Sequence, residues 1–228
     1  MSKLDTAIVD KHPTLNSRLW KDSETLHPEV QVALFKIAKE FFEFLDFAVP
    51  LVDLQVTGSQ ANYNYSSHSD LDLHLIVPYS EVDCDEPVAD LFDTKRKLWK
   101  QQHDITIYGV PVELYVEDTD KPVRGAAYSI MTDQWLREPD PTEVEVDDIE
   151  LRREMQIWLE RMNTVVQSRD LQKMQDLKDQ LQQYRKTALA RNGEYALENL
   201  VYKSLRNLGV ISELMTAIGV LKDQELSI

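Results

Sequence analysis

Residues 69–77, SDLDLHLIV, alternate between polar and apolar side chains, and this alternation constrains the fold more than any other feature of the chain. Successive side chains of a β-strand point to opposite faces, so the leucines share one face and Asp70, Asp72 and His74 share the other. The leucine face belongs on a hydrophobic core. We therefore expect a strand that closes a core on one side and presents two carboxylates on the other.

Helices and further strands are expected both before and after this strand in the sequence. Residues 28–47 begin with Pro-Glu and continue with apolar residues at helical spacing, which predicts an amphipathic helix. Residues 51–57 predict a short strand that ends at Gly58-Ser59. Residues 91–102 predict a helix, and residues 105–116 predict a hairpin that turns near Gly109. This order of elements indicates an α+β domain with a small mixed sheet and flanking helices.

The C-terminal part of the chain predicts only helices. Residues 138–150 are acidic and interrupted by prolines, which indicates a domain boundary and gives two domains, 1–140 and 141–228. Helix formers at helical spacing then predict a helical bundle, with a stop at Asn192-Gly193. Its expected helices cover residues 149–168, 170–191 and 194–217.

The charge of the chain is strongly acidic and unevenly distributed. The net charge is −15; residues 1–149 hold 13 basic and 29 acidic residues, and residues 150–228 hold 12 and 11. This balance argues against broad, sequence-independent binding of nucleic acid, which needs clustered Lys and Arg. Any phosphate-binding surface outside a metal site is therefore expected in the C-terminal part.

The remaining composition indicates a cytoplasmic protein. Cys84 is the one cysteine, so neither a disulfide within the chain nor a thiolate zinc site is expected. The sequence contains no uninterrupted apolar run of 18 residues and does not begin like a secretory signal. We accordingly predict no membrane partner.

The two aspartates of the central strand are the candidate metal ligands. Asp70 and Asp72 lie two residues apart, so they project from the same face and repel each other unless a cation lies between them. Closely spaced carboxylate oxygens suit Mg²⁺, which also takes substrate phosphates as ligands. The alternative is an acidic strand that simply faces solvent, because so short a motif is often coincidental.

The segment before the strand adds a glycine and a serine at a fixed distance. Gly58-Ser59 ends one expected strand, and ten residues separate it from Asp70. The pattern G-S-x10-D-x-D, with an apolar strand on each side, resembles the signature of the DNA polymerase beta-type nucleotidyltransferase superfamily, above all its small, minimal members. The resemblance covers roughly residues 28–118. The segments TGSQANYNYSSHSDLDLHLIV and ENLVYKSLRNLGV are also similar to uncharacterised nucleotidyltransferase-like proteins of tailed bacteriophages.

The resemblance implies an activity, its cofactors and a set of residues. It implies transfer of a nucleoside monophosphate from a nucleoside triphosphate (NTP), taken to be ATP, with Mg²⁺ or Mn²⁺ held by Asp70, Asp72 and a third carboxylate. Glu113 on a neighbouring strand is the candidate for the third, with Glu117 as the alternative. The implied nucleotide contacts include Gly58, Ser59, Ser69 and Tyr63. Tyr63 occupies the position where small family members usually carry a second glycine, so the base preference of relatives does not transfer.

Three basic residues are further candidates for nucleotide binding. Arg124 follows the expected third strand beside a glycine, and Lys203 and Arg206 lie three residues apart on a predicted helix. The alternative for each is a solvent-facing cation. His74 is a candidate contact to the acceptor or, alternatively, a packed side chain.

The acceptor and even the presence of activity remain open at this level. The acceptor hydroxyl can belong to an RNA end, a small molecule or a protein, in the host cytoplasm if the chain is phage-encoded. The rival class is a catalytically silent module that keeps the fold, such as an antitoxin-like protein or a phage accessory protein. A metal-dependent phosphohydrolase is disfavoured, because the histidines show no H-D or H-x-x-x-H arrangement.

Overall fold

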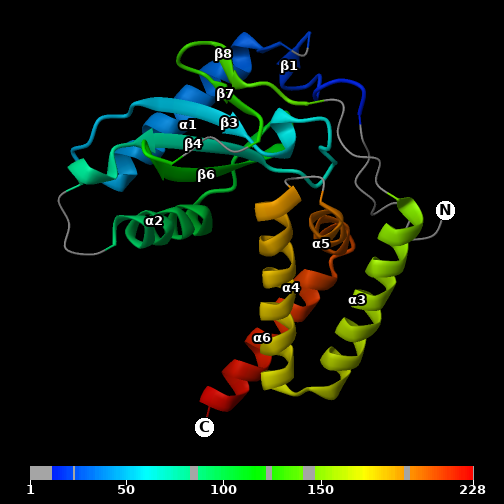
Figure 1. The fold of residues 1–228 in the computed structure, drawn as a ribbon. Helices are drawn as coiled ribbons and strands as arrows, with labels where there is room; N and C mark the ends of the chain where they lie inside the picture. The colour runs from blue at the N-terminus through cyan, green and yellow to red at the C-terminus, as the bar shows by residue number, and fades with distance from the viewer. Residues whose placement is uncertain are drawn as a thin grey trace. The chain divides into compact units, whose positions relative to one another are not determined.

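The computed structural model describes residues 12–22, 24–82, 87–121, 125–140, 147–192 and 196–227, with the backbone alone for 189–192. These residues form two compact units that divide between residues 141 and 142. The first contains a sheet with helices, and the second is helical (Figure 1).

The first unit is built on a six-stranded mixed sheet, which confirms the predicted α+β class. The strand order is β5-β6-β4-β3-β7-β8. Strands β4 and β6 are parallel, and every other neighbouring pair is antiparallel. The strands span Asp53–Thr57 (β3), Leu71–Val77 (β4), Thr106–Ile107 (β5), Val110–Asp118 (β6), Ala127–Ser129 (β7) and Gln134–Arg137 (β8).

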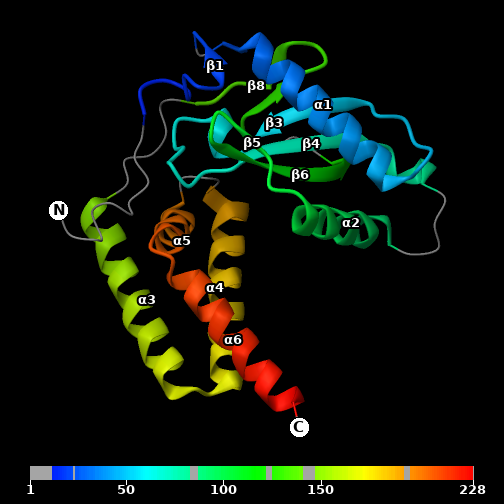
Figure 2. The ribbon, with the colours of Figure 1, turned by 180° about the vertical axis from the view of Figure 1, so that it is seen from behind.

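Two helices complete the core of the first unit. Helix α1 (Pro28–Leu45) crosses one face of the sheet, and α2 (Val88–Gln102) lies beside β6 (Figure 2). The leucines of β4 are fully buried against apolar side chains of both helices, among them Phe41 and Trp99, whose rings meet edge to face at 5.4 Å. The alternation of β4 therefore produces the expected core face, and its polar residues are half-buried on the opposite face.

A short N-terminal segment packs onto the same unit. Its two-residue strands β1 (Trp20–Lys21) and β2 (Thr25–Leu26) pair antiparallel. Trp20 is 2% exposed and stacks on Trp135 of β8 at 4.8 Å. This contact fixes the segment against the edge of the sheet that ends with β8.

The second unit contains four helices among its described residues. They are α3 (Asp148–Ser168), α4 (Leu171–Asn192), α5 (Leu197–Asn207) and α6 (Val210–Leu226). The prediction of one helix over residues 194–217 is wrong, because Gly209 adopts a left-handed φ of +81° and separates α5 from α6. Trp158, Leu181 and Val201 belong to the shared core of the unit.

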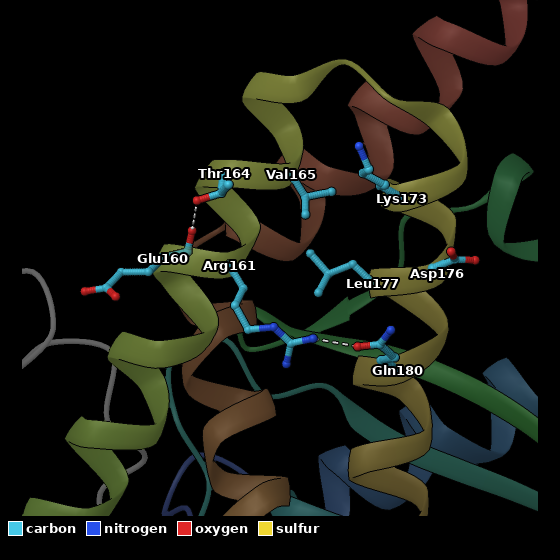
Figure 3. Close-up of a pocket in the computed structure, with 8 residues that line it drawn as sticks. All are labelled: Glu160, Arg161, Thr164, Val165, Lys173, Asp176, Leu177 and Gln180. Atoms are coloured by element: carbon cyan, nitrogen blue, oxygen red, sulfur yellow. Dashed lines mark hydrogen bonds between the residues drawn. The ribbon is translucent and has the colours of Figure 1, made fainter.

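A groove of about 420 Å³ lies between α3 and α4 (Figure 3). Arg161 spans it and donates a hydrogen bond to Gln180 Oε1 at 2.5 Å, with its guanidinium 4.4 Å from the Trp158 ring. Acidic and basic side chains line it together, so its charge does not select one class of ligand.

Within the described residues, no single helix combines the length and apolar character needed to cross a membrane. Helices α5 and α6 meet those two criteria only when taken together, and they are bent by 69° at their break.

Candidate functional site

The polar face of the sheet brings Asp72 next to residues of both neighbouring strands. Asp72 pairs in register with Thr57 on the antiparallel strand β3 and with Glu113 on the parallel strand β6. Register partners point to the same face, so the side chains of Asp72 and Glu113 leave the sheet on one side. Asp70 lies directly before β4 and is half-buried. The three predicted carboxylates thus lie on two neighbouring strands: Asp72 on β4, Glu113 on β6, and Asp70 directly before β4.

Gly58 lies against the carboxylate of Asp72. Its φ is +72°, in the left-handed region that favours glycine. A Cβ atom at this position would fall 1.9 Å from Oδ2 of Asp72, far inside van der Waals contact. Only glycine leaves room for this carboxylate at the end of β3. The Gly-Ser turn and the D-x-D strand therefore form one structural unit.

The loop between Ser59 and Asp70 is held in place by Gln60. Ser59 begins the 3-10 turn η1 (Ser59–Ala61), and Ser59 and Ser69 are both buried. The Gln60 side chain donates to the Ser69 carbonyl at 3.1 Å and accepts from Asn16 Nδ2 at 2.9 Å. Its own carbonyl accepts from the indole of Trp20 at 2.6 Å. These bonds fix the residue directly before Asp70.

Glu113 is held by two cations of α2. Its Oε1 accepts hydrogen bonds from Arg96 Nη1 at 3.1 Å and from Lys100 Nζ at 2.8 Å. Burial by itself would raise the pKa of Glu113, but the hydrogen bond from Lys100 and the charges of Lys100 and Arg96 lower the pKa below its usual range. Glu113 is therefore an ionised carboxylate. A metal ion could bind it only by displacing the hydrogen bonds from Arg96 and Lys100.

His74 is engaged by both of its ring nitrogens. Nε2 lies 2.9 Å from Thr57 Oγ1, and Nδ1 lies 3.3 Å from Glu117 Oε1. The ring also stacks on Tyr115 at 4.8 Å. These contacts tie β3, β4 and β6 together, and they correspond to the packed alternative for His74.

The pair of His74 and Glu117 gives an expected pH dependence of stability. Burial would raise the pKa of Glu117, but the hydrogen bond and charge of His74, together with Lys121, lower it to about 2. A depressed carboxyl pKa stabilises the fold above its unfolded value, near 4.3, and this stabilisation is lost as the pH falls through 2. We expect Glu117→Gln to lower the free energy of unfolding by at most about 3 kcal/mol at pH 7. In denaturant titrations, this difference from wild type should shrink between pH 5 and 2. The exposed Glu40→Gln should show no such trend, and equal trends in both variants would contradict the assignment.

The sequence did not predict the part played by α2. Arg96 lies 4.9 Å over the ring of Tyr115, and burial, followed by the charges of Asp72 and Glu113, raises the pKa of that tyrosine. The available signal was the basic run in TKRKLWK, unusual in the acidic N-terminal part, with Arg96 and Lys100 four residues apart on one helical face.

Other predicted nucleotide contacts lie elsewhere or are not described. Tyr63 is half-buried and lines a separate pocket of about 500 Å³ together with Glu24, Asp133 and Glu138. Such acidic surroundings do not favour phosphate, and a nucleotide role for Tyr63 stays a prediction. Arg124 lies outside the described residues.

The sequence placed Lys203 and Arg206 on one face of a helix, but in the structure they do not share a solvent-facing surface. Lys203 is 7% exposed in the core side of α5, whereas Arg206 is exposed. The residues around Lys203, including Leu200 and Ser204, are buried as well, because α5 is surrounded by the other three helices. The predicted role of both cations in nucleotide binding stays a prediction.

Among the residues that the structure describes, no group of three or more His, Cys, Asp or Glu side chains converges closely enough to hold a metal ion. Glu113 is turned to Arg96 and Lys100 instead. Comparisons of the chain with models of known families, with curated proteins and with solved structures found no match.

Proposed function

We propose that the chain is a Mg²⁺-dependent nucleotidyltransferase that moves a nucleoside monophosphate from an NTP, with ATP as the first choice, to a hydroxyl acceptor. The observation that carries this proposal is the contact between Gly58 and Asp72. It gives a physical reason for the G-S-x10-D-x-D spacing, since the glycine leaves space for the second aspartate. The mixed sheet, with Asp72 and Glu113 in register on parallel strands, supports a nucleotidyltransferase type of fold.

The donor chemistry of the site fits magnesium. Asp70, Asp72 and Glu113 offer only carboxylate oxygens, the hard ligands that Mg²⁺ prefers. Mg²⁺ bound there would neutralise the triphosphate and make the acceptor hydroxyl more acidic. Glu113 would exchange its bonds to Arg96 and Lys100 for this role, which leaves both cations beside the site to contact phosphate oxygens.

The chemical step is an in-line displacement at the α-phosphorus. The acceptor oxygen forms a bond to this phosphorus, the bond to the bridging oxygen of the β-phosphate breaks, and pyrophosphate leaves. Once released from Arg96 and Lys100, Glu113 would take the hydroxyl proton. The amides of the Gly58-Ser59 turn and the Ser59 hydroxyl are suited to bind the triphosphate.

The second candidate is a catalytically silent nucleotidyltransferase-fold module that binds or regulates a partner. The ion pairs of Glu113 with Arg96 and Lys100 favour it, because they already neutralise this carboxylate without a metal. Under this alternative the α2 cations are permanent partners of Glu113, and no divalent ion displaces them.

Glu113→Gln separates the two candidates. We expect wild type to transfer label from an α-labelled NTP, in the presence of Mg²⁺, to an acceptor in a host RNA and metabolite extract. Glu113→Gln should lower the rate by about a hundredfold or more, because it removes a metal ligand and a proton acceptor. Glu117→Gln, on the same strand and face, is the control and should keep the wild-type rate at neutral pH. No transfer by wild type would favour the silent module, and loss of rate only in Glu117→Gln would move the third carboxylate to that residue.

A further inference from the structure

A small pocket lies beside the motif loop, at the end of the sheet where β4 and β6 begin. Its volume is about 270 Å³, below the range of roughly 300–1,000 Å³ that is common for sites of drug-sized ligands. Ser66, Ser67 and Ser69 of the loop line it together with Asn16 and Arg18 of the N-terminal segment. The pocket also reaches Gly109 and Val110, at the start of β6. It is thus built from three segments that are distant in the sequence.

The lining is polar and carries no negative charge. None of the described lining residues is Asp or Glu, although residues 1–149 hold 29 acidic residues. The charged group is the exposed guanidinium of Arg18, accompanied by the imidazole of His12. The lining also holds four hydroxyls, those of Tyr65 and the three serines, and two side-chain amides. His12 Nε2 lies 3.0 Å from the Tyr65 carbonyl, which can only accept, so Nε2 carries the hydrogen of that bond. Such a lining suits a small anion with many acceptor oxygens.

The inner wall of the pocket is pre-organised, and the loop behind it has unsatisfied polar groups. The hydroxyl of Ser69, 5% exposed, accepts from the Ser66 amide at 2.9 Å, and Gln60 fixes the Ser69 carbonyl. Asn64 is 2% exposed, and neither its Nδ2 nor its Oδ1 has a hydrogen-bond partner among the described residues. A buried amide without partners costs about 1–3 kcal/mol. Asn64 itself does not line the pocket.

We propose that this pocket binds the acceptor of the transfer reaction and that the acceptor is a small molecule with both a hydroxyl and a phosphate group, such as a sugar phosphate. The assignment of the acceptor rests on the proposed function, whereas binding of the phosphate compound does not. The pocket is too small for a whole NTP. Ser69 lines the pocket and directly precedes Asp70 in the chain, so a molecule anchored by its phosphate at Arg18 would be held beside the residue that leads into the D-x-D motif. The hydroxyl oxygen of this molecule would bond to the α-phosphorus as pyrophosphate leaves.

Calorimetric titration of the full chain without metal tests the binding step, with ribose 5-phosphate, inorganic phosphate and ribose as probes. We expect saturable binding of ribose 5-phosphate and binding of ribose at least tenfold weaker. Arg18→Gln should weaken ribose 5-phosphate about tenfold, because it removes the guanidinium from an exposed position without disturbing the core. The equally exposed Arg137→Gln, outside the pocket, should bind like wild type.

The outcomes distinguish this inference from the proposed function. Asp70→Asn with Asp72→Asn should keep ribose 5-phosphate binding, because the pocket uses neither carboxylate. Binding that persists in a chain without transferase activity would reject the proposed function and the acceptor role but keep the phosphate site. Absence of saturable binding, or equal affinities of wild type and Arg18→Gln, would overturn the pocket assignment, even if transfer to another acceptor were observed.

Discussion

Replacing Gly58 with alanine is expected to lower the rate of nucleotidyl transfer about a hundredfold and to destabilise the first unit. The new Cβ would fall 1.9 Å from Asp72 Oδ2, so the carboxylate must move. A displacement on the order of 1 Å at a catalytic centre can cost about a hundredfold in rate. The backbone of Gly58, with φ +72° and ψ −157°, lies in a region that is almost restricted to glycine and adds roughly 1–3 kcal/mol of strain for a residue with a Cβ. Rates with an α-labelled NTP and denaturant titrations measure the two effects.

Gly125→Ala is the matched control for this variant. Gly125 also has a left-handed φ, +74°, but a Cβ atom there would meet none of the described residues within 4 Å. It should therefore lose stability only from its left-handed backbone and keep the full transfer rate. If Gly58→Ala were as active as Gly125→Ala, the approach of Gly58 to Asp72 would have no catalytic meaning.

The paired change Asp70→Asn and Asp72→Asn should eliminate stabilisation of the chain by Mg²⁺ and NTP. A ligand that binds only the native state at about 100 times its dissociation constant stabilises it by about 2.7 kcal/mol. For wild type this corresponds to a rise of several degrees in the melting temperature, roughly 5–10 °C. The double variant should keep its fold without ligand, checked by circular dichroism, and should show no rise with ligand. An unchanged rise in the variant would remove both aspartates from the metal site.

The central strands could be predicted because their patterns are local. The alternation in residues 71–77 defines β4, and the turn at Tyr108-Gly109 between β5 and β6 follows from the glycine at position 109. Strands β7 and β8 were not predicted. They contain three and four residues, too few for periodicity to be visible, and they form by pairing with β3 and with each other.

The parts of the site that depend on tertiary contacts could not be predicted. An arginine and a lysine on a helix are usually exposed, and the sequence does not indicate that Arg96 and Lys100 reach Glu113 on β6. The burial of the Lys203 side chain was not predictable for the same reason, since only the packing of α5 shows it. By contrast, it could be predicted that Asp72 and Glu113 lie close together. Two acidic residues on neighbouring strands meet whenever the strands pair in the matching register.

The most direct measurement follows the label of α-labelled ATP, with Mg²⁺ and an acceptor extract, in wild type and in the Asp70→Asn, Asp72→Asn double variant. We expect wild type to place the α-phosphate on an acceptor and to release one pyrophosphate for each transfer. The double variant, with an intact fold by circular dichroism, should show no transfer above background. Transfer at the wild-type rate in the double variant, or release of phosphate from the γ position without transfer of the α-label, would contradict nucleotidyl transfer at Asp70 and Asp72.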